Sequence, residues 1–128
     1  LGDRLHQCRL LLALGRLEIG SGRLARAEEL VLDAKMFADR NRFRRESALA
    51  DELLGDVLLA RGDTDKAFFN YELGLEKSRR ISTDNDLEGE LLRRMASVHL
   101  ANGRYDEAIG VAQRLGLPHP DCDVVHQK

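Results

Sequence analysis

The sequence predicts an all-α protein built as a solenoid of three antiparallel helix pairs, and three observations predict it. Apolar residues recur at helical spacing over almost the whole chain. Both prolines, Pro118 and Pro120, lie near the C-terminus, so no proline interrupts the helices before them. A pattern of small residues occurs three times at offsets 0, 7 and 12, with 40 and then 41 residues between copies: Gly15, Gly22 and Ala27; Gly55, Gly62 and Ala67; Ala96, Gly103 and Ala108. A fixed period of this length is typical of repeat proteins, in which each unit buries its apolar face against its neighbours.

Six helices are expected from the apolar spacing and the polar breaks, over about residues 5–19, 24–37, 43–61, 64–81, 87–101 and 105–115. They pair into repeats of about 5–39, 43–81 and 85–117, followed by a flexible tail, 118–128. The first helix has a broad apolar face that includes Leu14 and Leu17. Polar residues 39–42 predict the connector between the first two repeats.

The ends of the helices carry recognisable signals. A glycine closes the first helix of each pair, and we expect a left-handed backbone there: Gly22, Gly62 and Gly103. Asp63 is expected to cap the fourth helix, and Asn85 with Glu88 has the spacing of a capping box for the fifth.

Within each pair, small residues predict close helix crossings, because a large side chain there would push the backbones apart. One crossing carries Gly15, Gly55 and Ala96 in the three repeats, and the other carries Ala27, Ala67 and Ala108.

Composition excludes several classes of function. The formal charge of −2 gives no general attraction to nucleic acid, and no apolar run approaches the roughly 20 residues that span a bilayer. A signal-peptide pattern is absent from the sequence. Cys8 and Cys122 lie at opposite ends of the predicted stack, which argues against a disulfide and favours the cytoplasm. Because the chain begins at Leu1, we expect it to be a segment of a longer protein.

These residues resemble the tetratricopeptide repeat family. Its signature has Leu-Gly in the first helix, Gly before the turn, Ala early in the second helix and an aromatic residue four positions later. The second repeat matches with Leu54-Gly55, Gly62, Ala67 and Tyr71, whereas Val31 and Ala112 replace the aromatic residue in the other two. Pro120 falls where the family often has a terminating proline.

The resemblance covers about residues 5–117 and implies a right-handed superhelix whose first helices line a concave groove. The usual repeat is about 34 residues long. The longer repeat here is similar to those of kinesin light chains, cell-polarity adaptors and bacterial regulators, and residues 86–94 are similar to the bacterial group.

Carried over by position, the resemblance implies groove residues that would touch a peptide or helix of a partner: Arg9, Arg16, Glu52, Asp56, Glu90, Arg93, Arg94 and Ser97. Arginine in such a groove can pair bidentately with carboxylate or phosphate. An internal lattice, in which Glu52 and Asp56 pair with Arg16 or Arg93, is an equal alternative. Binding to chaperone tails is disfavoured, because only Arg94 agrees with the residues that such members use. Asparagine-based peptide binding is also disfavoured, since no asparagine maps to the groove.

Three further features have a structural interpretation that we favour over a functional one. A basic cluster at the first connector is expected to be a solvated helix entry rather than a nucleic-acid site: Arg40, Arg42, Arg44 and Arg45. His119, Cys122 and His126 have a metal-like spacing but lie in the tail, so no metal is expected. Of Phe68, Phe69 and Tyr71, two should point inward. The third is either core as well, which we favour, or an exposed anchor.

The sequence carries no phosphate loop, no Gly-x-Ser-x-Gly and no zinc-protease motif, so neither an enzyme nor a cofactor is expected. The expected function is a protein–protein interaction module of a larger bacterial regulatory or signalling protein. Self-association through exposed terminal helices is the alternative, because the last helix has no following pair to cover its apolar residues: Ile109, Val111, Ala112, Leu115 and Leu117.

Overall fold

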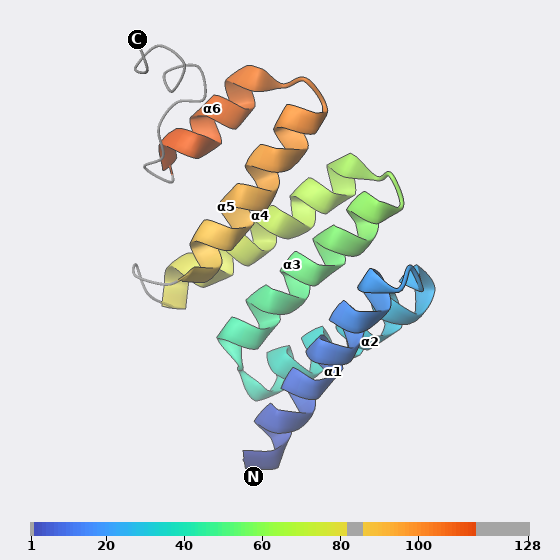
Figure 1. Ribbon diagram of the computed structural model, residues 1–128. Helices are drawn as coiled ribbons and strands as arrows, with labels where there is room; N and C mark the ends of the chain where they lie inside the picture. Colours follow the sequence, from blue (N-terminus) through green and yellow to red (C-terminus); the bar gives the residue numbers. More distant parts are fainter. Residues whose placement is uncertain (1, 82–85, 115–128) are drawn as a thin grey trace. The chain divides into compact units, whose positions relative to one another are not determined.

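The structure, a computed structural model, describes residues 2–81 and 86–114, and all regular secondary structure in these ranges is α-helical (Figure 1). The all-α prediction is therefore confirmed. The helices are α1 (Gly2–Gly20), α2 (Leu24–Asn41), α3 (Arg44–Ala60), α4 (Thr64–Ile81), α5 (Asp86–Ala101) and α6 (Tyr105–Arg114). None of these six, over the ranges described, has the length and apolar character needed to cross a membrane.

The chain divides into two compact units, Leu1–Asn85 and Asp86–Lys128. In the first unit α2 packs against α1 and α3, α3 packs against α4, and α1 also contacts α3. In the second unit α5 packs against α6.

The three turns inside the helix pairs share one geometry. Gly22, Gly62 and Gly103 have φ of +80°, +85° and +73°, which confirms the left-handed conformation expected for them. The amide after each glycine donates to a carbonyl five residues back, as Asp63 does to Leu58 at 2.9 Å. This pattern satisfies carbonyls that the helix end leaves free.

Asp63 acts as the expected N-cap of α4, because the amide of Lys66 donates to its Oδ1 at 3.3 Å. The capping box proposed for α5 includes Asn85, which lies outside the described residues, as do the tail 118–128 and Leu115.

The connector between α2 and α3 differs from the prediction. Helix α2 continues to Asn41, so the connector is residues 42–43 rather than 39–42. Arg42 takes the left-handed conformation (φ 60°, ψ 35°), and the amide of Phe43 donates to the carbonyl of Ala38 at 2.8 Å. The hydrogen-bonding pattern is the same as in the glycine turns. Here, however, the left-handed residue carries a side chain, so its backbone conformation is strained. The sequence suggested an earlier end because residues 39–42 are all polar.

The helices of the first unit cross closely where small residues were expected. A Cβ added to Gly15 would lie 2.6 Å from Cγ2 of Val31, and one added to Gly55 would lie 2.6 Å from Cδ1 of Tyr71. Ala27 and Ala67, on the partner helices, are fully buried. In the second unit Ala108 is buried and Ala96 is half-buried.

One face of α1 does not match the prediction. Leu14 and Leu17, expected to face inward, are exposed, and so is Leu10. Cys8 and Leu12, which the sequence placed on the same apolar face, are buried as expected. The apolar residues of α1 occupy two faces of the helix, so their spacing alone did not identify the one that packs.

Candidate functional site

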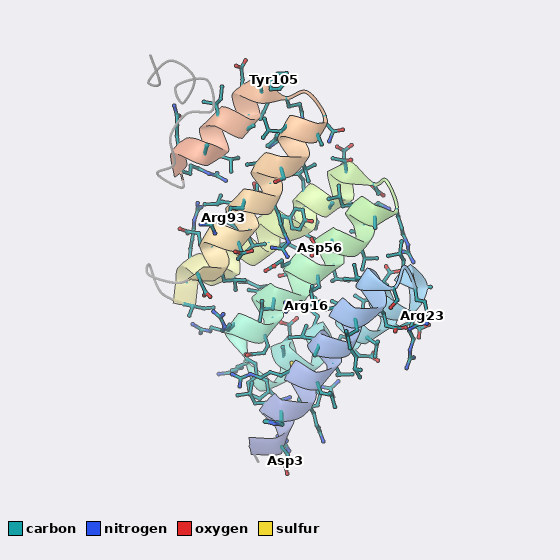
Figure 2. All side chains as sticks on the ribbon, in the orientation of Figure 1. Asp3, Arg16, Arg23, Asp56, Arg93 and Tyr105 are labelled. Carbon is teal, nitrogen blue, oxygen red and sulfur yellow. The ribbon has the colours of Figure 1, made fainter. Side chains whose placement is uncertain are left out.

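The groove residues expected in the first unit lie on α1 and α3, two helices that contact each other. Figure 2 shows Arg16 on α1 and Asp56 on α3. Arg16 is exposed. The side chain of Arg9 is 58% exposed, and its Nε donates to Oε2 of Glu46, at the start of α3, at 3.2 Å. Both arginines are thus exposed on α1, and Arg9 contacts α3.

The two carboxylates expected in this groove are less accessible than the arginines. Glu52 is only 3% exposed. Asp56 is half-buried and accepts a hydrogen bond from the Tyr71 hydroxyl at 2.6 Å. That hydrogen bond joins α3 to α4 within one helix pair, and so differs from the lattice across repeats that the sequence suggested.

Four of the expected groove residues lie on α5 in the second unit: Glu90, Arg93, Arg94 and Ser97. The carboxylate of Glu90 lies 3.4 Å from Arg93 Nη1 and 3.2 Å from Arg94 Nη1. Arg93 and Ser97 are exposed, whereas Arg94 is half-buried. One carboxylate thus faces two guanidinium groups on a single helix.

The sequence interpretation missed a buried ion-pair cluster in the first unit. Asp51 on α3 is fully buried, with Oδ1 2.8 Å from Lys35 Nζ on α2 and Oδ2 2.7 Å from Lys77 Nζ on α4. Asp51 lies three and four residues from buried Ala48 and Gly55, so helical phase was a signal that could have found it. A lone carboxylate is usually assumed to be exposed.

A pocket of about 400 Å³ lies where the α2–α3 connector meets the last turns of α4. We call it the connector pocket. Its charged lining residues are Asp39, Arg42, Arg44, Lys77 and Arg80, accompanied by Ala38, Phe43 and Ser47. Of the basic cluster noted in the sequence, Arg42 and Arg44 line the pocket; the fold adds Lys77 and Arg80 from a helix more than 30 residues later.

A hydrogen-bonded chain runs along the inner side of the connector pocket. Lys77 donates to Oγ of Ser47 at 2.8 Å, and Ser47 donates to Oδ1 of Asp39 at 2.6 Å. Because Lys77 also contacts Asp51, the pocket and the buried ion-pair cluster share one lysine.

The exposed apolar residues of the first unit include an aromatic ring on α4 and a row of leucines on α1. Phe69 is 65% exposed, so the expectation that all three aromatic residues of α4 are core was wrong. Phe68 and the fully buried Tyr71 form an edge-to-face pair with ring centroids 6.4 Å apart, whereas Phe69 lies on another side of α4. The row of leucines is the α1 stripe, which we define as Leu10, Leu14 and Leu17.

The ionisable groups with shifted pKa values do not form a reactive site. Burial raises the pKa of the Cys8 thiol, with the nearby Glu46 carboxylate adding to the shift, and Sγ donates to the carbonyl of Ala34 at 3.5 Å. A hydrogen bond from Arg23 lowers the pKa of Glu18, and the two form a bidentate pair with both contacts at 2.8 Å. Cys8 is thus a packed thiol, and Glu18 belongs to a surface ion pair.

Over residues 2–81 and 86–114, no group of three or more His, Cys, Asp or Glu side chains is placed to hold a metal ion. His119, Cys122 and His126 lie outside these ranges. Comparison with models of known protein families, with curated proteins and with solved structures finds no match for the chain.

Proposed function

We propose that the chain is a non-enzymatic protein–protein interaction module, a tetratricopeptide-like right-handed superhelix that binds a peptide or helix of a partner in its concave groove. The observation that carries the proposal is the pair of exposed arginines on α1, Arg9 and Arg16, the first of which contacts α3. The repeated small-residue crossings and the three matching glycine turns support the repeat architecture. The parent protein in this proposal is a bacterial regulator, and the module acts in the cytoplasm.

The chemistry of this surface favours an acidic segment. Arg9 and Arg16 are seven residues apart on α1 and therefore on one side of the helix, about 10 Å apart along its axis. A guanidinium group presents a planar fork of N–H donors that matches a carboxylate. Arg9 already pairs with Glu46, whereas Arg16 is the more available donor group. An acidic peptide with carboxylates spaced by about two helical turns would satisfy both.

Selection from a random peptide library displayed on phage tests the proposal, with the chain immobilised. We expect enrichment of peptides rich in Asp and Glu, and at least tenfold weaker binding of a selected peptide to Arg16→Glu. The matched control is Arg26→Glu, which reverses the charge of an arginine on the exposed side of α2. If both variants weaken peptide binding equally, only the net charge of the chain matters. If no peptide is enriched, the proposal is wrong.

The α1 stripe favours a second candidate, self-association. Leu10, Leu14 and Leu17 follow one another at spacings of four and three, so they share one face of α1, and Leu17 is 65% exposed. A contiguous apolar strip of this kind is characteristic of a contact surface.

Sedimentation velocity over a range of concentrations tests self-association. Self-association is supported if the unaltered chain forms dimers and Leu17→Lys abolishes them. The control is Met36→Lys, which should leave the dimers intact, because Met36 is a similarly exposed apolar residue on α2. A monomer at every concentration would exclude it.

A further inference from the structure

We propose that the connector pocket binds a phosphomonoester, the doubly charged phosphate group of a small molecule or of a phosphorylated side chain. Four cationic side chains line it, one from the connector, one from the first turn of α3 and two from the last turns of α4. These residues do not belong to the α1–α3 surface, so the inference goes beyond the proposed function.

The charges around the pocket leave it positive. Asp39 is the one carboxylate among the lining residues, and the Ser47 hydroxyl donates to it. Lys77 shares the buried Asp51 with Lys35, so one carboxylate faces two ammonium groups. The cluster of two lysines and one aspartate therefore carries a net positive charge, and its Lys77 lines the pocket.

The arginines add to this charge. Arg80 pairs with Glu76 at 2.8 Å, but both side chains are largely exposed, and such pairs are weak in water. In the ranges that the structure describes, neither Arg42 nor Arg44 has an ion pair. Both guanidinium groups are therefore available to an anion.

The backbone of the connector supports the same assignment. Helix α3 begins at Arg44, and the residue before it, Phe43, makes no side-chain cap. The first amides of α3 carry the partial positive charge of a helix N-terminus, and Phe43 and Arg44, at that N-terminus, line the pocket. Arg42 also keeps a left-handed conformation that glycine would adopt at lower cost, and strained backbone of this kind is frequent at binding sites.

The shape of the pocket selects the class of anion. A volume of about 400 Å³ leaves room for a phosphate that carries a substituent. Guanidinium groups bind phosphate oxygens bidentately, and half-buried Phe43 offers an apolar wall for the rest of the ligand. Because the cations converge on one concave site and the whole chain has a charge of −2, the arrangement fits a single phosphate better than a nucleic-acid backbone.

Titration of the isotope-labelled chain with O-phospho-L-serine, followed by two-dimensional NMR of the backbone amides, tests the proposal. We expect saturable shifts at Arg42, Phe43, Arg44 and Ser47, and none with serine at the same concentrations. The Arg42→Gly and Arg44→Gln variants should each bind about tenfold more weakly or worse. Arg42→Gly is informative because glycine suits the left-handed backbone there, so lost binding cannot be attributed to a lost helix end.

The matched control is Arg26→Gln, which removes one exposed positive charge from α2 outside the pocket and should leave the affinity unchanged. Absence of saturable shifts, or equal weakening by Arg26→Gln and Arg44→Gln, would overturn the proposal. Inorganic phosphate and a nine-residue peptide containing one phosphoserine identify the source of the phosphate. Tighter binding of the peptide than of O-phosphoserine assigns the site to a phosphorylated protein segment, and equal binding assigns it to a small phosphorylated molecule.

Discussion

At the scale of single residues, Arg42 occupies a position that glycine occupies at three other helix ends. Gly22, Gly62 and Gly103 take positive φ without a steric cost, whereas the Cβ of Arg42 crowds its own backbone. The hydrogen bond from Phe43 to Ala38 holds the connector in this conformation nonetheless. The α2–α3 connector therefore stores strain that the turns inside the helix pairs avoid.

Replacing Arg42 with glycine should therefore stabilise the protein, by about 0.5–1 kcal/mol, because the strain disappears and the exposed side chain contributes little packing. The matched change Gly62→Ala should destabilise by about 1 kcal/mol, since a Cβ at Gly62 meets no atom within 4 Å and the cost is purely conformational. Urea denaturation followed by circular dichroism measures both. A loss of stability in Arg42→Gly would show that the side chain contributes more than the strain costs.

Asp51 is a fully buried carboxylate whose charge is balanced by two lysines. Its carboxylate is tolerated in the interior because Lys35 and Lys77 approach it from two other helices.

Asp51→Asn should lower the free energy of unfolding by roughly 3 kcal/mol, because two ammonium groups would then lack their counter-charge. Partial exposure of the lysines, 24% and 31%, lets them turn towards water and keeps the loss from being larger. The surface change Glu29→Gln, which removes an exposed carboxylate from α2, serves as the control and should cost less than about 0.5 kcal/mol. Similar losses in the two variants would contradict the assigned role of Asp51.

At the scale of elements, each helix pair of the first unit is held by a small residue that faces a larger one. Gly55 on α3 lies against the ring of Tyr71 on α4, and the Tyr71 hydroxyl donates to Asp56 one residue further along α3. The hydrogen bond between Tyr71 and Asp56 therefore requires the close approach of α3 and α4, because a wider separation of the two helices would break it.

Gly55→Ala should destabilise the protein by about 1–3 kcal/mol, since the added methyl group would overlap the buried ring and force α3 and α4 apart. The control is Gly20→Ala near the end of α1, where a Cβ meets nothing within 4 Å and stability should stay within about 1 kcal/mol of the original. Thermal unfolding reports on both changes, and so does the near-ultraviolet circular dichroism, to which the buried Tyr71 contributes. Unchanged stability in Gly55→Ala would mean that the tyrosine ring moves aside freely.

At the scale of the whole molecule, the helices differ in how many neighbours support them. Within the first unit α3 packs against α1, α2 and α4, and it carries the fully buried Ala48, Ala50 and Asp51. Within the second unit α6 packs against α5 and spans only Tyr105–Arg114. Local opening costs less for an element with fewer packed neighbours.

Native-state hydrogen exchange should therefore show the slowest amides in α3 and the fastest helical amides in α6. The expected difference exceeds tenfold in protection factor, because α6 is short and within its unit packs against α5 alone, whereas α3 packs against three helices of its own unit. Exchange measured residue by residue by NMR provides the comparison. Equal protection of the two helices would indicate that the two units unfold as one.

The sequence by itself determined the helical class, the approximate positions of six helices and the three left-handed turns. It did so because these features depend on local chemistry: apolar residues at helical spacing, and glycine where φ must be positive. The close crossings at Gly15 and Gly55 were also predictable, since only a small residue allows two helix backbones to approach.

Only the tertiary structure decided which side chains are buried and which meet. Glu52 and Asp51 are buried while Phe69 and Leu17 are exposed, against their usual preferences. Burial at these positions depends on which side of each helix its neighbours cover. Helical spacing indicates that side for Asp51 but not for the others. The connector pocket arises in the same way, since the fold brings Lys77 and Arg80 to Arg42 and Arg44 across a separation in sequence that no local pattern reveals.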